Sequence, residues 1–256
     1  MKTIITSCLS WILFVSSALA ADNAVFVERE TKIEHAALNG GAEVLAGQVA
    51  GIDHDLAAAP SDPALLYLRA LAHYAEACVA RAERNNASVE TQMNAAVEML
   101  AQIKDPTWEG EALALQGFIL NQLIGVKGFD SAEELGPKSA ALLAQAGGRA
   151  PNSPRVQFFR GESLVTTPEA WGGDVVLGIK LLEQAAQSFD HQPKTALLHW
   201  GQAEGLVWLG IARQKSGDVA GARTAWERAL AAEPEYGWVK YVLLPSLDKS
   251  TAANKK

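Results

Sequence analysis

Residues 203–236 carry the pattern that most restricts how this chain of 256 residues can fold. The pattern consists of Gly210, Gly217-Asp218, Ala222, Trp226, Ala229 and Pro234. Residues three or four positions apart lie on one face of a helix, so the small and aromatic residues after the Gly-Asp pair form one stripe. Proline cannot continue that helix. The pattern therefore predicts two antiparallel helices whose backbones approach closely where Gly210 faces Ala222.

This stretch resembles one tetratricopeptide repeat (TPR). Known repeats follow the pattern W-x2-L-G-x2-Y…A-x3-F…P. The sequence matches it except at the first aromatic slot, which is Leu206, and at the tyrosine slot, which is Arg213. The resemblance is strongest over about residues 193–236, weaker over residues 107–190 and weakest before residue 62. It implies an α-helical scaffold that binds other molecules, and it implies no particular reaction.

Prolines recur along the chain at the spacing of stacked helical hairpins. They are Pro63, Pro106, Pro154, Pro193 and Pro234, separated by 43, 48, 39 and 41 residues. Proline suits the first turn of a helix, and an Asp or Ser before it caps the free N–H groups. Ser139 and Leu143 also repeat the spacing of the small and aromatic residues described above. We therefore predict an all-α fold, a right-handed TPR-like solenoid of roughly four or five helical hairpins over residues 61–247.

The ends of the chain predict additional segments. Apolar residues at helical spacing in 25–38 and 43–58 predict that residues 21–60 form a cap or a divergent hairpin. After Pro234, a short apolar helix containing Trp238 is expected to cover the last repeat. The polar tail 248–256 is expected to be disordered.

Residues 1–20 have the features of a cleavable signal peptide. Lys2 forms a minimal basic region, an apolar stretch too short to span a bilayer follows, and Ala18-Leu19-Ala20 has the small-x-small spacing of a cleavage site. We predict cleavage after Ala20 and location in a Gram-negative periplasm. The alternative is a short N-terminal anchor helix. Without residues 1–20, the chain carries 21 basic and 29 acidic residues, a net charge of −8.

That charge disfavours nucleic acid and anionic membrane surfaces as partners. Only Cys78 remains after cleavage, so the mature chain can form no internal disulfide. None of the five histidines belongs to an HExxH motif or a zinc-type set, and no phosphate-binding glycine loop or nucleophile motif occurs. We therefore predict no enzyme activity, no catalytic residues, no cofactor and no metal site.

Two insertions lengthen the connections inside the predicted hairpins, at residues 126–137 and 166–174. Insertions in helical repeats fall on loops of one face, which is often a binding face. The alternative, equally open from the sequence, is that they only extend the edge of the solenoid.

The TPR resemblance also implies a binding surface. In that family, the first helix of each hairpin lines a concave face that contacts ligands. Transferred slot by slot, this face contains Tyr67, Tyr74, Phe118, Asn121, Arg155, Phe158 and Gln214, with Trp171 on an inserted loop beside it. We expect a protein or peptide partner held by apolar contacts. The alternative is a small apolar ligand, bound by a protein that works with a transport or envelope-assembly system. These side chains could also simply pack against a neighbouring helix.

Overall fold

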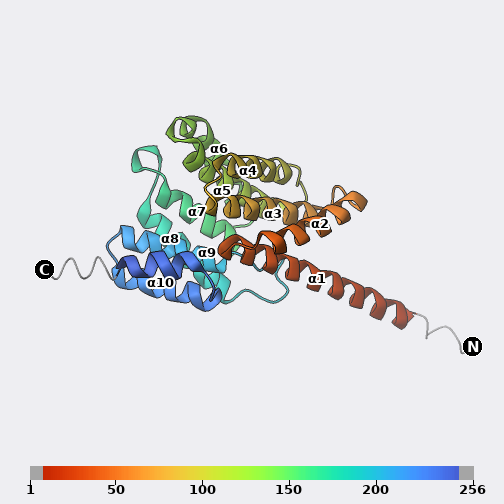
Figure 1. The fold of residues 1–256 in the computed structure, drawn as a ribbon. Helices are drawn as coiled ribbons and strands as arrows, with labels where there is room; N and C mark the ends of the chain where they lie inside the picture. Colours follow the sequence, from red (N-terminus) through yellow and green to blue (C-terminus); the bar gives the residue numbers. More distant parts are fainter. Residues whose placement is uncertain (1–7, 248–256) are drawn as a thin grey trace, which may run out of the picture.

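The structure, a computed structural model, describes residues 8–247, with side chains from Asn23 onward. Within that part of the chain the fold is entirely helical and contains no strand (Figure 1). The helices are α1 (Cys8–Asn39), α2 (Ala42–Ala58), α3 (Pro63–Ala82), α4 (Asn86–Leu100), α5 (Glu109–Lys127), η1 (Phe129–Ser131), α6 (Ala132–Arg149), α7 (Pro154–Thr166), η2 (Glu169–Trp171), α8 (Val175–Asp190), α9 (Gln202–Lys215), α10 (Val219–Ala232) and the π-helical segment η3 (Val239–Leu243).

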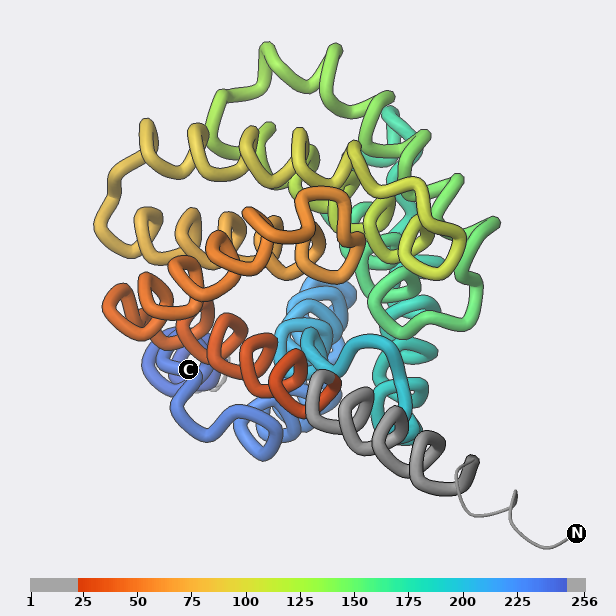
Figure 2. The backbone as a smooth tube through the Cα atoms, turned by 90° about the vertical axis from the view of Figure 1, so that its right-hand side faces the viewer, coloured from red at the N-terminus to blue at the C-terminus, as the bar shows by residue number. Residues whose placement is uncertain are grey.

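Helices α3 to α10 pack in consecutive pairs: α3 with α4, α5 with α6, α7 with α8, and α9 with α10. Each pair also packs against the next, through α4 and α5, α6 and α7, and α8 and α9 (Figure 2). The first helices of neighbouring pairs touch as well, α5 with α7 and α7 with α9. First helices therefore form an inner layer, and second helices lie outside them.

Several of these helices begin at the capping residues predicted from the sequence. The Asp62 side chain accepts the N–H groups of Ala64 and Leu65 at the start of α3, and Ser153 accepts that of Val156 in α7. Proline occupies the first turn in both helices. Pro193 differs, because residues 191–201 form an irregular connection and α9 begins only at Gln202.

The small and bulky residues of the repeat pattern meet in the same register in three successive pairs. A Cβ atom on Gly117 would lie 2.8 Å from Leu143 Cγ, and a Cβ atom on Gly161 would lie 2.8 Å from Leu182 Cγ. In the last pair the indole of Trp226 lies against Gly210 and donates its N–H to the Val207 carbonyl at 3.0 Å. The three atoms nearest to a Cβ atom on Gly210 would all belong to Trp226, and the expected contact of Gly210 with Ala222 stays a prediction.

Ala222 is fully buried in α10, which makes it a test of this packing. Replacing Ala222 with leucine adds volume to a filled contact and is expected to destabilise the protein by about 1–3 kcal/mol. The urea unfolding midpoint measures the effect. Ala220→Leu, on the exposed side of the same helix, is the matched control. Equal midpoints for the two variants would contradict the observed packing.

Helix α1 contacts both the N-terminal and the C-terminal parts of the stack of helical pairs. It packs against α2 and α3, and its acidic side chains also reach the C-terminal half of the chain. The Glu30 carboxylate accepts the N–H of His199 at 2.9 Å, and Glu34 accepts the N–H of Gly201 at 2.7 Å. In Figures 1 and 2, α1 lies between the α3 pair and the α9–α10 pair. The inner layer is therefore covered by a segment of the same chain.

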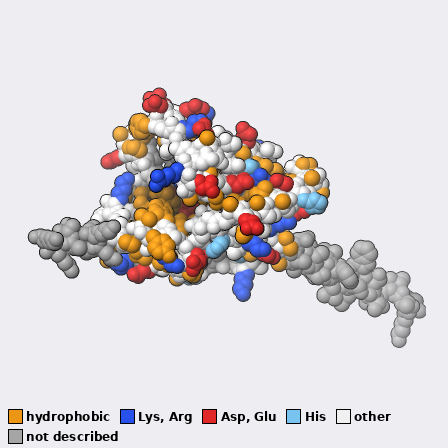
Figure 3. All heavy atoms as spheres, viewed as in Figure 1, with side chains coloured by type: hydrophobic (Ala, Val, Ile, Leu, Met, Phe, Trp, Pro, Cys, Tyr) orange, Lys and Arg blue, Asp and Glu red, His pale blue; other side chains and the backbone are white. Residues whose placement is uncertain are grey.

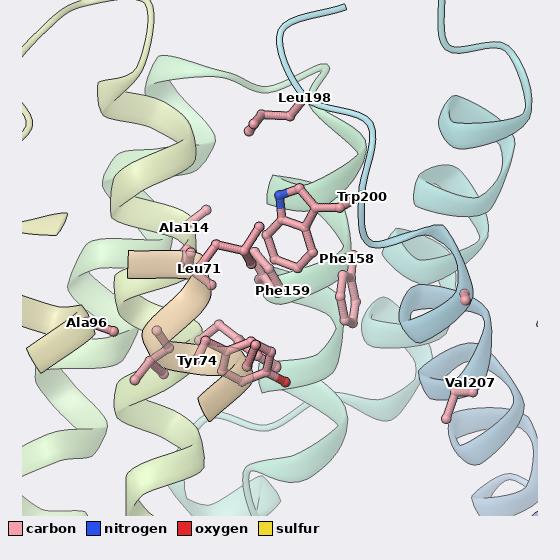
Figure 4. Packing of buried hydrophobic residues seen from close by; sticks show 14 of the residues in the cluster. Leu71, Tyr74, Ala96, Ala114, Phe158, Phe159, Leu198, Trp200 and Val207 are labelled. Carbon is pink, nitrogen blue, oxygen red and sulfur yellow. The ribbon is translucent and has the colours of Figure 1, made fainter. Parts of the chain in front are cut away.

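The centre of the molecule is an aromatic cluster built from the inner helices (Figure 4). The ring centroids of Tyr74 and Phe118 lie 5.6 Å apart, and those of Phe118 and Phe159 lie 4.5 Å apart. Phe159 also lies 5.9 Å from the ring of Trp200, which the irregular connection inserts into the cluster. Aromatic pairs at these distances stabilise beyond the area they bury. The connection before α9 is therefore part of the core.

Several predictions concern the chain ends. The predicted signal peptide falls on residues 1–7, which lie outside the described residues, and on residues 8–20, of which only the helical backbone is described. The predicted tail 248–256 also lies outside them. The last helix buries Val239 and Leu243, whereas Trp238 is 41% exposed. None of the helices in the described part of the chain combines the length and apolar character that crossing a membrane requires.

Candidate functional site

Most residues predicted to line an open concave face are buried. Tyr67, Phe118 and Phe158 have no exposed surface, and Tyr74 and Arg155 have 5% and 2%. The prediction that they line one open surface is wrong. They do converge, because the first helices share the inner layer. Their large side chains meet one another there, and α1 and the connection before α9 cover them.

Arg155 has a structural partner in this interior. Its Nε donates to Glu111 Oε2 at 3.1 Å, and its Nη1 donates to the Trp200 carbonyl at 3.0 Å. The Ser153 hydroxyl donates to the other Glu111 oxygen at 2.6 Å. The guanidinium therefore neutralises a buried carboxylate and holds the Trp200 backbone in place.

The remaining three predicted residues lie apart from that core. Gln214 is exposed near the end of α9. Asn121 and Trp171 both line a cleft between the α5–α6 pair and the α7–α8 pair. Binding by any of these residues stays a prediction, and the cleft is the place where two of them come together.

The two insertions predicted from the sequence meet at one end of this cleft. The rings of Phe129 and Trp171 stack with their centroids 4.8 Å apart. Gly128 and Gly172, each next to one of these residues, both have a φ of 94°, which favours glycine. Much of the first insertion is helical, since α5 continues to Lys127 and α6 begins at Ala132. The longer helices and the second loop together raise the walls of the cleft.

The cleft has a volume of about 930 Å³ and mostly apolar walls. On one side α6 presents small residues, the partly buried Gly136 and the exposed Pro137, Ala140 and Ala144. On the other side lie Leu164 and residues 166–168, and Trp208 of α9 also contributes. Figure 3 shows the surface hollowed near α7, with hydrophobic side chains inside the hollow. Because α6 offers small side chains, the space between α6 and α7 is left unfilled.

A carboxyl group lies at the base of the cleft. Glu162 has no exposed surface, and its two oxygens accept N–H groups from Asn121 and Gln122, both at 3.1 Å. Burial raises the pKa of Glu162 to about 8, and the neighbouring Glu204 adds to the shift. At neutral pH this group is therefore mostly an uncharged acid, which suits an apolar site.

Arg160 is the one cationic side chain that lines the cleft within the described residues. It is half-buried, and its guanidinium lies against α6, because a Cβ atom on Gly147 would lie 2.7 Å from Nη1. No hydrogen bond or ion pair of this side chain occurs among residues 23–247. Sequence reasoning missed Arg160, because this residue occupies none of the slots that the TPR resemblance assigns to the concave face.

Other reactive groups lie outside the cleft. Burial raises the pKa of the Cys78 thiol to about 12, so this side chain is not a thiolate at neutral pH. Within the described part of the chain, no group of three His, Cys, Asp or Glu residues is placed to hold a metal ion. The cleft itself offers apolar surface, the buried acid Glu162, the exposed carboxyl group of Glu133 and one guanidinium, which are groups suited to binding.

A scan of protein-family models gives no match to this sequence, and no curated protein matches it. The function is therefore argued from the geometry of the cleft.

Proposed function

We propose that this protein is an exported, non-enzymatic, TPR-like helical repeat protein that binds an apolar ligand in the cleft between the two insertions. The observation that carries the proposal is the cleft of about 930 Å³ with apolar walls, beneath the stacked rings of Phe129 and Trp171. Small-molecule sites in proteins are typically about 300–1,000 Å³ in volume and are lined mainly by apolar groups with a few polar ones. The cleft has this size and this composition.

The TPR-like assignment rests on the repeated register of a glycine facing a bulky residue in three successive pairs. Helical pairs with this small-to-large contact are what the TPR pattern describes. Export to a Gram-negative periplasm rests on the sequence of residues 1–20 alone. A protein of this kind would receive its ligand from, or pass it to, a transport or envelope-assembly system.

A ligand in the cleft is a better proposal than a peptide on the concave face. The aromatic side chains that were expected to hold a peptide are buried against one another and against α1. A peptide there would have to displace α1 and break its bonds to residues 199 and 201. The cleft, in contrast, needs no rearrangement to admit a ligand.

The proposal predicts that filling the cleft weakens ligand binding. Ala140 is exposed on the α6 wall of the cleft, so Ala140→Phe places a ring in the ligand space without crowding the core. We expect this variant to bind the neutral fluorophore N-phenyl-1-naphthylamine about tenfold or more weakly than the unchanged protein. Fluorescence titration of the purified protein measures the affinity.

Ala141→Phe is the matched control, because Ala141 is exposed on the same helix but does not line the cleft. It should leave both the affinity and the thermal midpoint unchanged. If both variants bind the fluorophore as well as the unchanged protein does, the ligand site is elsewhere. If neither the unchanged protein nor the control binds this fluorophore or another apolar ligand, the proposed function is wrong.

A further inference from the structure

We infer that the natural ligand is a linear apolar chain ending in a carboxylate or similar anion, with the anionic end at Arg160 and the apolar end beneath Phe129 and Trp171. This inference rests on the proposed function and specifies the chemistry of its ligand. It follows from the positions of charge and of aromatic surface along the cleft.

The cleft is elongated, and its two ends differ. Its lining on α6 runs from Ala132 to Ala144, which is about 18 Å at 1.5 Å per residue. The stacked rings lie at the beginning of α6, next to Ala132. The Arg160 guanidinium lies against Gly147, one turn beyond the other end of that lining. A ligand that fills the cleft lengthwise therefore meets a cation at one end and aromatic rings at the other.

The guanidinium of Arg160 favours an anionic ligand. A half-buried cation without a protein partner attracts an opposite charge more strongly than an exposed one does, because the surroundings screen less. A guanidinium binds a carboxylate through two parallel N–H donors, and it binds phosphate or sulfate in a similar way. An anionic end group would supply the partner that residues 23–247 do not.

The buried acid at the base of the cleft does not favour a cationic ligand. Glu162 has no exposed surface, and both of its oxygens already accept amide N–H groups. A cation would have to displace these amides and take the proton from the buried acid. An anion at Arg160 needs neither change.

The opposite end of the cleft suits an apolar chain. Phe129 is 66% exposed and Trp171 is 47% exposed, and the nearby Leu177 also lines the cleft with 43% of its surface exposed. Glu133 lies at this end as well, so a negative end group would be repelled from it. Exposed aromatic and aliphatic groups at the end of an apolar cleft mark it as a binding surface.

The test compares ligands that share one chain length and differ in end group. Dodecanoate, dodecanol and dodecyltrimethylammonium are titrated below their micelle or solubility limits into the mature protein at pH 7.5, and binding is followed by calorimetry. We expect dodecanoate to bind at least about tenfold more tightly than dodecanol. Arg160→Gln should remove this preference by weakening dodecanoate alone, and Arg160→Lys, which keeps the charge, should retain part of it.

Arg149→Gln is the matched control, since Arg149 is an exposed cation near the end of α6 that pairs with Glu109 at 3.3 Å and does not line the cleft. It should keep the preference for dodecanoate. Equal affinity for the acid and the alcohol, tighter binding of the cation, or an unchanged preference in Arg160→Gln would each overturn the inference. A peptide with an apolar C-terminus that binds while dodecanoate does not would also overturn it.

The two proposals can fail separately. If N-phenyl-1-naphthylamine binds in the cleft but the dodecyl ligands show no preference for the acid, only the inference about the anion is wrong. If the fluorophore and all three dodecyl ligands fail to bind, the proposed function is wrong as well.

Discussion

Replacing Arg155 with methionine is expected to destabilise the protein by about 3–5 kcal/mol, the range found when one partner of a buried ion pair is removed. Arg155 is 2% exposed, and its guanidinium donates to Glu111 and to the Trp200 carbonyl. Methionine fills a similar volume but leaves the Glu111 carboxylate buried without a cation. Chemical unfolding at pH 7 measures the loss.

Two further variants separate the charge from the packing. The double variant Arg155→Met/Glu111→Leu removes both charges, and it is expected to recover most of the lost stability. Arg149→Met removes an exposed cation that pairs with Glu109, and it should change stability by less than about 1 kcal/mol. If Arg155→Met has normal stability and loses only ligand binding, Arg155 belongs to a binding site and its structural role is wrong.

The helices and their consecutive pairing could be predicted from the sequence because they depend on local features. Capping residues such as Asp62 and Ser153 determine where helices begin, and their side chains bond within three residues of themselves. The contact between Gly117 and Leu143 depends on a spacing that is visible along the chain. Such features need no knowledge of how the pairs are arranged in space.

The error about the concave face has a long-range cause. Slot positions in a repeat identify which side chains point inward, and they correctly grouped Tyr74, Phe118 and Phe158. They do not tell how tightly the pairs curve or what fills the space between them. Here Tyr74 donates to Glu204, which is 130 residues away in the sequence, and α1 covers the inner layer. Contacts at that separation leave no local pattern.

The cleft could be predicted from the sequence only in part. Both insertions were visible as extra residues, and helical pairs of alternating direction bring successive inner connections to the same end of the stack. Their meeting could therefore have been expected. The stacking of Phe129 on Trp171, and the place of Arg160 between α6 and α7, depend on side-chain packing that repeat spacing does not encode.

The second large effect concerns pH. Four glutamates have a raised pKa because the fold removes them from water; Glu30 and Glu162 are buried, and Glu34 and Glu204 are partly buried. Burial raises the pKa of Glu30 and Glu204 from the ordinary value of 4.5 to about 7. It raises the pKa of Glu34 and Glu162 to about 8. For Glu34, the nearby carboxyl groups of Glu30, Glu204 and Glu233 add to the shift, and the hydrogen bond from the Gly201 N–H opposes it.

These shifts determine whether the free energy of unfolding rises or falls with pH. Between pH 4.5 and about 7–8 the folded protein holds protons on these carboxyls that the unfolded chain has released. The stability that these four groups contribute is therefore fully present below pH 4.5. It is lost as the pH rises through their folded-state pKa values. A single carboxyl whose pKa rises from 4.5 to about 7 accounts for roughly 3 kcal/mol of this loss. Glu76, whose folded-state pKa is lowered, titrates below 4.5 and adds no slope in this range.

We therefore expect the free energy of unfolding to fall by roughly 3 kcal/mol or more between pH 5 and pH 8, with a matching fall in the thermal midpoint. Denaturant unfolding at constant ionic strength gives the slope. Glu34→Gln removes one titrating group while its amide oxygen can still accept the Gly201 N–H, so this variant should have a visibly flatter slope. Glu98→Gln, an exposed position on α4, should leave the slope unchanged. Stability that is constant or increases from pH 5 to pH 8 would show that these carboxylates are solvated, and that α1 does not lie against the inner helices as described.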